Sequence, residues 1–353
     1  MPQLRVVVIG GSAGGLDPLI EIVEQLPIGL PVCVLVVLHT RAQGDSYLPT
    51  ILRRRSRMPV AFAVHGEPPA PGRIYVARPD AHLLMTRNGL LLSSGPRENG
   101  FRPAIDPLFR TAARIHRGNA MGVILSGGLD DGTYGLKVIK DAGGTAVVQD
   151  PTEASIPTMP QSAIRVVAVD HVLKASAIGV IMIDWASRPA EGATMARKEE
   201  PEPQDPSDET DVQEMQEEFG PPSGLTCPDC GGALWQLDEG RLTRYRCHVG
   251  HQYTIEGLDA EQHAQVEAAL WTAVRVLEEH ADLRQRMARR ADASGLGMVS
   301  QSFAESARDS ARQAHTIREL LYRRGPPPES PAAAAARAAK PAEEKRKARR
   351  RVR

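Results

Sequence analysis

The sequence predicts an α/β fold with a mainly parallel, doubly wound sheet, followed by a small unit containing cysteine and histidine and by a pair of helices. Two observations predict the sheet. From residue 1 to about residue 187, short β-branched runs alternate with helical patterns, as in folds where helices connect parallel strands. Three of the runs, residues 5–9, 32–38 and 121–125, are apolar almost throughout, as strands covered on both faces are.

Shorter strands complete the predicted sheet. We expect them at residues 60–64, 73–76 and 145–148. An edge hairpin is expected over residues 82–93, because two apolar runs flank Arg87-Asn88-Gly89. An Asn-Gly pair readily adopts the positive φ angles that a tight hairpin turn requires.

Composition divides the 353 residues into five segments. We expect an α/β domain over residues 1–187, an acidic disordered linker over 188–222, a cysteine- and histidine-containing unit (the Cys/His unit) over 223–254, a helical hairpin over 255–324 and a basic disordered tail over 325–353. The linker carries 11 acidic and 3 basic residues, and it has too few apolar side chains to offset its chain entropy by burial. The first helix of the hairpin is expected to start near Leu258, with Asp259 and Gln262 as a capping box.

Charge and hydropathy exclude several classes of protein. The 43 basic residues balance the 43 acidic ones, so the net charge indicates no nucleic-acid partner. We interpret the basic tail as a solvated terminus, because it lacks interleaved aromatic residues. No apolar run approaches the roughly 20 residues that span a bilayer, and no signal peptide is evident. We therefore expect a cytoplasmic protein without membrane insertion, in a reducing compartment.

A glycine-rich turn directly follows the first predicted strand, in residues 6–15, VVVIGGSAGG. As a Gly-x-Ser-x-Gly nucleophile elbow, the turn would hold the Ser12 hydroxyl above the sheet. A dinucleotide-binding turn would need a glycine in place of Ser12 and an acid at the end of the second strand. That strand ends at His39 instead, which favours the elbow. The alternative is a glycine-rich turn that binds phosphate, or one that only allows the strand and the helix to pack closely.

Side chains of three chemically matched types are expected at one edge of the sheet. Ser12 follows the first strand, His39 follows the second, and Asp130 and Asp131 follow the strand at residues 121–125. Parallel strands present functional groups at their carboxyl ends. An imidazole can take the proton of a serine hydroxyl, and a carboxylate fixes the tautomer of the imidazole. Taken singly, a strand-end histidine is often only a packing group, and Asp-Asp-Gly suits a turn or a helix cap.

An ordered series of motifs over residues 4–185 resembles the catalytic domain of the chemotaxis protein-glutamate methylesterase family, CheB. The motifs are VIGGSAGG at 8–15, VLH at 37–39, GRIYVARPDAHLL at 72–84, RPAID at 102–106, GVILSG at 122–127, DDG at 130–132, and Met159-Pro160 with Ala163. The ordered series is far more specific than any single motif.

The resemblance implies hydrolysis of glutamate γ-methyl esters on chemoreceptor signalling helices, with glutamine deamidation as a second activity. The family's nucleophile falls on Ser12, its histidine on His39, and its aspartate on Asp131, the residue just before the glycine. No cofactor is expected for catalysis. We expect the backbone N–H groups of Ala13 and Gly128 to bind the oxyanion, although Gly128-Leu129 stands where the family commonly has methionine and glycine.

The resemblance also implies partners. A methyl-accepting chemoreceptor-type protein would be the substrate, in a chemotaxis or another signalling pathway, and a cognate methyltransferase would form the ester. Because the motifs begin by residue 4, we expect a receiver-less member of the family. Such a member lacks the phosphoacceptor domain that precedes the catalytic domain in its best-known relatives.

A second group of residues has the spacing of metal ligands. Cys227 and Cys230 form a C-x2-C knuckle, and after 16 intervening residues Cys247 and His251 form a C-x3-H knuckle. Three thiolates and one imidazole suit a tetrahedral zinc, and four protein ligands leave no position for a catalytic water. We therefore predict a structural, zinc-ribbon-like unit, similar to one found in receiver-less CheB-like proteins. His248 is the alternative fourth ligand, and a redox or incidental thiol cluster is the alternative to zinc.

Two other functions are compatible with the sequence. A catalytically idle adaptor would use the α/β domain and the Cys/His unit to bind signalling proteins, and its Ser12 would not react with a serine-directed phosphonate. A nucleotide-binding oxidoreductase would bind NAD, but the acid that such a protein needs after its second strand is missing.

Overall fold

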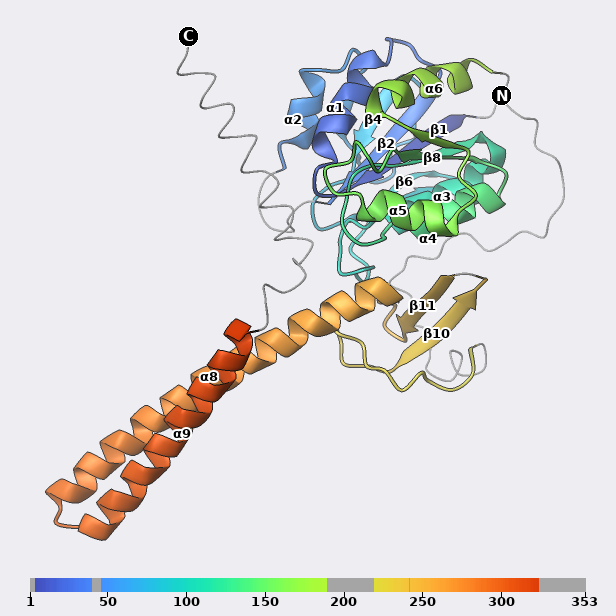
Figure 1. Cartoon of the computed structure of the whole chain (residues 1–353). Coiled ribbons are helices and arrows are strands. Elements are labelled where there is room, and N and C mark those ends of the chain that lie inside the picture. The colour runs from blue at the N-terminus through green and yellow to red at the C-terminus, as the bar shows by residue number, and fades with distance from the viewer. Residues whose placement is uncertain (1–3, 40–45, 189–218, 241, 324–353) are drawn as a thin grey trace, which may run out of the picture. The chain divides into compact units, whose positions relative to one another are not determined.

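A computed structural model describes residues 4–39, 46–188, 219–240 and 242–323 of the chain (Figure 1). The described chain forms two compact units, of which the first extends to Leu258 and the second begins at Asp259. The predicted basic tail lies outside the described residues, and so does the predicted linker except for residues 188 and 219–222.

A seven-stranded parallel sheet is the centre of the first unit. Its strand order is β3-β4-β2-β1-β7-β8-β9, and every neighbouring pair is parallel. The strands are β1 (Arg5–Gly11), β2 (Val32–Leu38), β3 (Val60–Phe62), β4 (Arg73–Val76), β7 (Ala120–Ile124), β8 (Thr145–Gln149) and β9 (His171–Leu173). All six strands predicted for the sheet are present, and β9 is an additional short edge strand.

Helices cover both faces of this sheet, as a doubly wound fold requires (Figure 1). One face packs against α1 (Leu16–Gln25), α2 (Leu48–Arg53) and α6 (Ala175–Ser187). The other packs against α3 (Ile105–His116), α4 (Thr133–Asp141) and α5 (Thr158–Val166), and a short 3₁₀ helix, η1 (Arg117–Asn119), leads from α3 into β7. The α/β architecture predicted from the sequence is confirmed.

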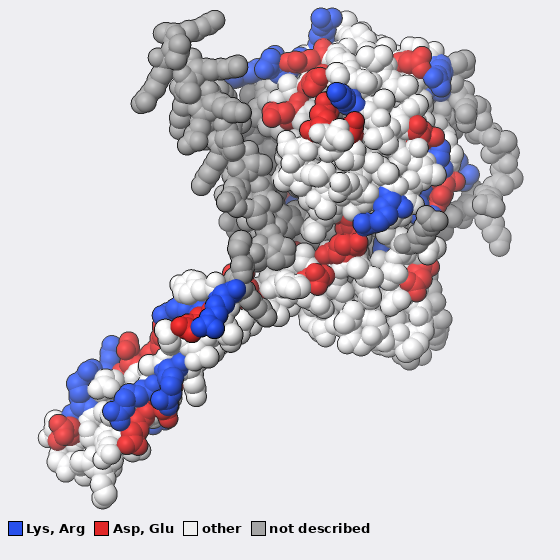
Figure 2. Space-filling view, viewed as in Figure 1, with Lys and Arg blue, Asp and Glu red and all other residues white. Residues whose placement is uncertain are grey.

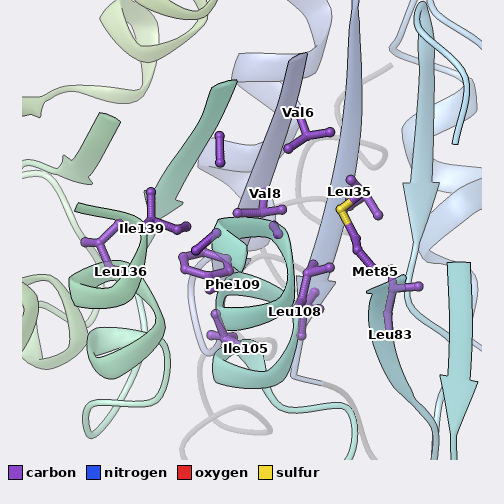
Figure 3. Close-up of a cluster of buried hydrophobic side chains, with 14 of the residues drawn as sticks. Val6, Val8, Leu35, Leu83, Met85, Ile105, Leu108, Phe109, Leu136 and Ile139 are labelled. Carbon is purple, nitrogen blue, oxygen red and sulfur yellow. The ribbon is translucent and has the colours of Figure 1, made fainter. Parts of the chain in front are cut away.

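The core beneath α3 is continuous with the sheet (Figure 3). Phe109 lies beside Val8 of β1 and beside Leu136 and Ile139 of α4, and all four side chains are fully buried. Burying such a side chain contributes roughly 1.5–3 kcal/mol each. This packing fixes α3, whose first turn lies at the candidate site described below.

The predicted hairpin forms, but not at the edge of the main sheet. Its strands, β5 (His82–Thr86) and β6 (Gly89–Ser93), pair only with each other, as a separate antiparallel sheet. The apolar side chains of Leu83, Met85 and Leu90 are buried in the same core as α3. Leu90 of β6 exchanges backbone hydrogen bonds with Gly66 and Glu67, which follow the edge strand β3, but the hairpin does not pair with β3 itself.

The Cys/His unit is a three-stranded antiparallel sheet of β10 (Leu234–Glu239), β11 (Leu242–Cys247) and β12 (Gln252–Thr254). Helix α8 (Ile255–Ala293) follows it directly. The predicted start near Leu258 is therefore wrong by three residues, and Asp259 lies inside the helix rather than at its cap. Thr254 is the cap, because its Oγ1 accepts the Gly257 N–H at 3.0 Å.

The second unit contains the predicted helical pair, formed by α8 and α9 (Gly297–Arg323). His280 Nδ1 lies 2.9 Å from Ser310 Oγ, and Ser300 Oγ donates to the Ala288 carbonyl at 2.9 Å, so the two helices run antiparallel. Basic and acidic side chains are interspersed along both helices (Figure 2). Within the described part of the chain, no helix combines the length and apolar composition that a bilayer crossing needs.

Candidate active site

The candidate site lies at the carboxyl ends of β1, β2 and β7. β1 pairs with β2 on one side and with β7 on the other. The chain builds outward from β1 in one direction through β2 and β4, and then returns to its other side with β7. Open α/β sheets bind their ligands at such a point, where the strand order reverses.

The Ser12 turn is tied to the loop after β7. The Ser12 N–H donates to the Ser126 carbonyl at 2.9 Å, and the Ser12 carbonyl accepts the Gly15 N–H at 3.0 Å. Gly14 adopts a φ of 77° and lies so close to Ser126 that a Cβ there would come within 2.7 Å of the Ser126 Oγ. The glycine is needed for both reasons. These contacts hold Ser12 at the tip of a tight turn, with only 6% of its surface exposed.

His39 lies directly after β2 and faces both Ser12 and Asp131. Its N–H donates to the Gly11 carbonyl at 3.0 Å, which extends the pairing of β1 and β2. On the ring, Nδ1 lies 3.2 Å from Ser12 Oγ, and Nε2 lies 2.8 Å from Asp131 Oδ2. Because a carboxylate only accepts, Nε2 carries the proton and Nδ1 is free to accept the Ser12 hydroxyl proton. Chymotrypsin-type triads use the two ring nitrogens the other way round.

Asp131 belongs to the loop between β7 and α4, and its carboxylate is fully buried against the N-terminus of α3. Its Oδ2 accepts the Ile105 N–H at 2.7 Å as well as the His39 proton, and its Oδ1 accepts the Asn99 Nδ2–H at 3.1 Å and the Asp106 N–H at 3.3 Å. Burial alone would raise the pKa of Asp131, but the hydrogen bond and the charge of His39, together with the hydrogen bonds from Ile105 and Asn99, hold that pKa below its ordinary value. The carboxylate therefore stays ionised beside the imidazole.

Two further buried acids, Asp106 and Asp130, lie near Asp131. Burial, together with the charge of Asp131, raises the pKa of Asp106 well above its ordinary value, although its Oδ1 accepts the Gly135 N–H at 2.6 Å. Burial also raises the pKa of Asp130 to about 7. Asp130 Oδ1 accepts the Thr254 hydroxyl at 2.8 Å and makes no contact with His39. Of the two candidate acids in the sequence, only Asp131 lies against the imidazole.

A tight turn over residues 98–101, which is not among the predicted site residues, supports the site. Asn99 and Gly100 both adopt positive φ angles, 51° and 76°, and Asn is one of the few residues that tolerates them. The turn directs Asn99 at Asp131 and stacks Phe101 on His39, with ring centroids 3.7 Å apart and planes 12° apart. Its first residue, Glu98, forms a buried two-point ion pair with Arg110 of α3, both contacts being 2.7 Å. The Asn-Gly pair was the available sequence signal.

Of the two predicted oxyanion donors, Ala13 directly follows Ser12, and Gly128 belongs to the loop after β7. The Gly127 N–H is engaged by the Ile156 carbonyl at 3.0 Å. By contrast, no acceptor among the described residues takes the N–H of Ala13 or Gly128. A Cβ at Gly127 would come within 2.9 Å of the Ser12 Cβ, whereas one at Gly128 would meet open space. Both free N–H groups are thus available close to the nucleophile position.

His82, which lies outside this group, has a structural role. His82 is fully buried, accepts the Ala104 N–H on Nδ1 at 3.2 Å, and donates from Nε2 to the Pro96 carbonyl at 2.9 Å. Burial lowers the pKa of His82, so the ring is neutral and holds the loop that leads into α3.

The four predicted metal ligands come together in the Cys/His unit. The ligand atoms of Cys227, Cys230, Cys247 and His251 all lie within 4.8 Å of one another, and this group could hold a metal ion. His248 is not part of the group. Its ring lies against Gly232 instead, where a Cβ would come within 2.8 Å of the His248 Cε1.

A serine, an imidazole and a carboxylate in contact at the strand ends of an α/β sheet make up the constellation of a serine hydrolase. Comparisons with known proteins narrow this class. Residues 7–182 match the family model described as CheB methylesterase. The crystal structure of the Thermotoga maritima CheB methylesterase catalytic domain is similar, with 34% sequence identity and a TM-score of 0.50 over 52% of this chain and 98% of that one.

Curated relatives agree with this match. A Leptospira interrogans protein named "Putative protein-glutamate methylesterase/protein-glutamine glutaminase" is 40% identical to the chain over 178 residues. The aligned region covers 50% of this chain and 92% of that protein. The chain is 36% identical over 170 residues, 48% of its length, to a Pseudomonas aeruginosa protein-glutamate methylesterase/protein-glutamine glutaminase, of which it covers 51%. The chain belongs to the CheB methylesterase family, and it spans about half the length of the longer relatives.

Proposed function

We propose that the chain is a protein-glutamate methylesterase that hydrolyses glutamate γ-methyl esters on methyl-accepting, chemoreceptor-type proteins, with glutamine deamidation as a second activity. The observation that carries the proposal is the contact of His39 with both Ser12 and Asp131 in a chain of this family. A cognate methyltransferase would form the ester that this enzyme removes. The cytoplasm is the proposed compartment, since none of the four cysteines forms a disulfide.

The proposed mechanism is a two-step acyl transfer. His39 Nδ1 takes the Ser12 Oγ proton as the oxygen attacks the ester carbonyl, and the collapsing tetrahedral intermediate expels methoxide, which takes that proton and leaves as methanol. Water then attacks the acyl-enzyme, again giving a proton to Nδ1, which returns it to the Ser12 oxygen as the glutamate leaves. Asp131 keeps Nε2 protonated throughout and stabilises the charged imidazole. With a glutamine substrate, the first leaving group is ammonia.

The Ala13 and Gly128 N–H groups are proposed to hold the oxyanion of each intermediate. Two backbone donors without another described acceptor support this role, because a preorganised donor stabilises the developing charge without reorganisation. In other hydrolases, the loss of one such donor costs about 10²- to 10³-fold in kcat.

We also propose that the Cys/His unit holds a structural zinc. A tetrahedral zinc with Zn–S bonds near 2.3 Å keeps its sulfur ligands about 3.8 Å apart. Cys230 Sγ lies 3.6 Å from Cys247 Sγ, which lies 3.5 Å from His251 Nδ1. Four protein ligands leave no open position, so the ion would stabilise the fold of the unit and take no part in the ester hydrolysis.

A methanol-release assay on methylated receptor tests the proposed activity. The wild-type protein should release methanol, and Ser12→Ala should release it only at the background rate. Ser187→Ala, which removes an exposed hydroxyl at the end of α6, is the matched control and should retain full activity. Full activity in Ser12→Ala would refute the assignment of the nucleophile. Failure of wild-type Ser12 to react with a serine-directed phosphonate would instead favour the idle adaptor.

A further inference from the structure

The end of the Cys/His unit contacts the turn that supports the catalytic centre, and both belong to the first compact unit. The Asn99 N–H donates to the Gln252 carbonyl at 2.8 Å, and the Thr254 N–H donates to Asn99 Oδ1 at 2.9 Å. Glu98 and Gln252 are paired as in a short parallel bridge. The turn is thus held by β12 in the manner of an added strand.

These contacts determine which way the Asn99 side chain faces. Because its Oδ1 accepts from the Thr254 N–H, its Nδ2 must face the other way, toward Asp131 Oδ1 at 3.1 Å. The residue is 5% exposed, and a reversed amide would set two buried N–H groups against each other on one side. The amide therefore has one satisfied orientation, in which it donates to the carboxylate.

Thr254 also reaches the loop that carries Asp131. Its hydroxyl donates to Asp130 Oδ1 at 2.8 Å while accepting the Gly257 N–H at the start of α8. Nearby, the Arg244 guanidinium of β11 stacks 3.6 Å from the ring centroid of Tyr134 in α4. Thr254, which is only 1% exposed, thus connects the 98–101 turn, the Asp130-Asp131 loop and the first turn of α8.

We propose that Asn99 is a positioning residue for the Asp131 carboxylate, and that Thr254 of the Cys/His unit holds it in that role. The inference rests on the Ser12–His39–Asp131 relay proposed above. Asn99 shares the negative charge of Asp131 and fixes its plane, so that Oδ2 stays in line with His39 Nε2. The Cys/His unit is then a support for the catalytic centre as well as an appended domain.

The test measures the rate at which a fluorophosphonate labels Ser12 in the full chain, because this reaction needs the relay but no receptor. Asn99→Gly retains the positive φ and removes the amide, and labelling should slow by about 10- to 100-fold, as expected for losing a hydrogen bond to a charged group. Thr254→Val removes, at nearly constant volume, the hydroxyl whose bonds to Asp130 Oδ1 and the Gly257 N–H hold the Thr254 N–H in place against Asn99 Oδ1. It should slow labelling by about 3- to 10-fold. Thr254→Ser keeps the hydroxyl and should label at the wild-type rate.

Asn88→Gly is the matched control, because Asn88 also precedes a glycine but lies exposed in the β5–β6 turn, where its N–H donates to Thr86 Oγ1. It should label at the wild-type rate, and thermal unfolding identifies any variant that fails to fold. In the methanol assay, Asn99→Gly should lower kcat and leave KM unchanged, since a positioning residue does not touch the substrate. A partly unfolded sample would also lower the apparent kcat at constant KM, so the division is read only from a variant that thermal unfolding shows to be folded.

Three results would overturn the inference: wild-type labelling in Asn99→Gly, equal rates in Thr254→Val and Thr254→Ser, or no labelling of Ser12 in the wild-type protein. The last result would refute the relay itself. A different outcome would separate the two proposals. If Ser12 is labelled in the wild-type protein and more slowly in Asn99→Gly, but neither protein releases methanol from methylated receptor, the proposed substrate is refuted and the positioning role is supported.

Discussion

Replacing Asp131 by asparagine should remove most of the activity, because it disturbs the hydrogen bonds that orient His39. One oxygen of Asp131 accepts from His39 Nε2 and the Ile105 N–H, and the other accepts from Asn99 Nδ2 and the Asp106 N–H. Asparagine offers one oxygen and one NH₂ group. Whichever way the new amide turns, its NH₂ group faces two nitrogen atoms that donate in the wild-type protein.

Each orientation has a definite cost. If the NH₂ group faces His39, Nε2 must accept, and Nδ1 then carries the proton and cannot take one from Ser12. If it faces Asn99 and Asp106, two buried N–H groups lose their acceptor, at about 1–3 kcal/mol each. The same substitution in a Ser-His-Asp protease lowers kcat about 10⁴-fold. We expect a loss of about 10³- to 10⁴-fold in kcat, or about 4–5.5 kcal/mol of activation free energy, with little change in KM.

Methanol release at saturating methylated receptor measures this loss. Asp170→Asn is the control, because Asp170 also accepts a backbone N–H, that of Ala146 at 2.8 Å, but at the opposite end of the strands. It should retain the wild-type kcat. A kcat for Asp131→Asn within about tenfold of wild type would mean that tautomer control by this carboxylate supplies little of the rate, and the proposed relay would be wrong.

Three further changes test the structure around the site. Glu98→Gln should cost about 3–5 kcal/mol of unfolding free energy at pH 7 by leaving Arg110 unpaired. Burial opposes ionisation of Glu98, but Arg110 holds its pKa below the ordinary 4.5, so the ion pair stabilises the fold above pH 4.5 and is lost as the pH falls through the lower folded pKa. Urea unfolding should show wild type and variant converging in acid, and a constant difference would contradict this. Gly14→Ala should lower the unfolding free energy by about 1–3 kcal/mol and slow Ser12 labelling, because φ is 77° and the new Cβ would lie 2.7 Å from Ser126 Oγ; unchanged thermal unfolding would exclude the strain. If the proposed zinc is bound, a chelator should expose the amides of residues 223–254 to hydrogen exchange and slow labelling of Ser12, and added zinc should reverse both effects. Full protection in the presence of the chelator would show that the unit folds without metal.

The sheet and the meeting of the relay residues could be predicted from the sequence, because both follow from short-range patterns. Buried parallel strands are continuous apolar runs, and β1, β2 and β7 lie where such runs occur. Side chains directly after parallel strands share one edge, which is why Ser12, His39 and Asp131 could be expected together. The prediction of the CheB family from the ordered motifs is confirmed by the comparisons.

The contacts of Asn99 and Thr254 could not be predicted, because they depend on how distant segments pack. Asn99-Gly100 indicates a tight turn, but no local pattern gives the direction of the asparagine amide. Thr254 lies 155 residues further along the chain. Thr254 also caps α8, and its contacts with Asp130 and Asn99 stabilise this cap. The helix therefore begins at Ile255 and not at the capping box expected at Asp259. The edge strand β9 was missed because it is three residues long and only partly buried.

The residues of the site come from distant parts of the chain, so the order of synthesis determines when the site is complete. A nascent chain that has emerged only as far as β2 contains the serine and the histidine, but it lacks β7, whose pairing with β1 brings the acid alongside them. The last anchor, at residue 254, emerges later still. Domains generally fold as units during synthesis, N-terminal parts first, so hydrolytic competence can arise only after the acid at residue 131 has emerged, and the site is complete only after residue 254 has emerged.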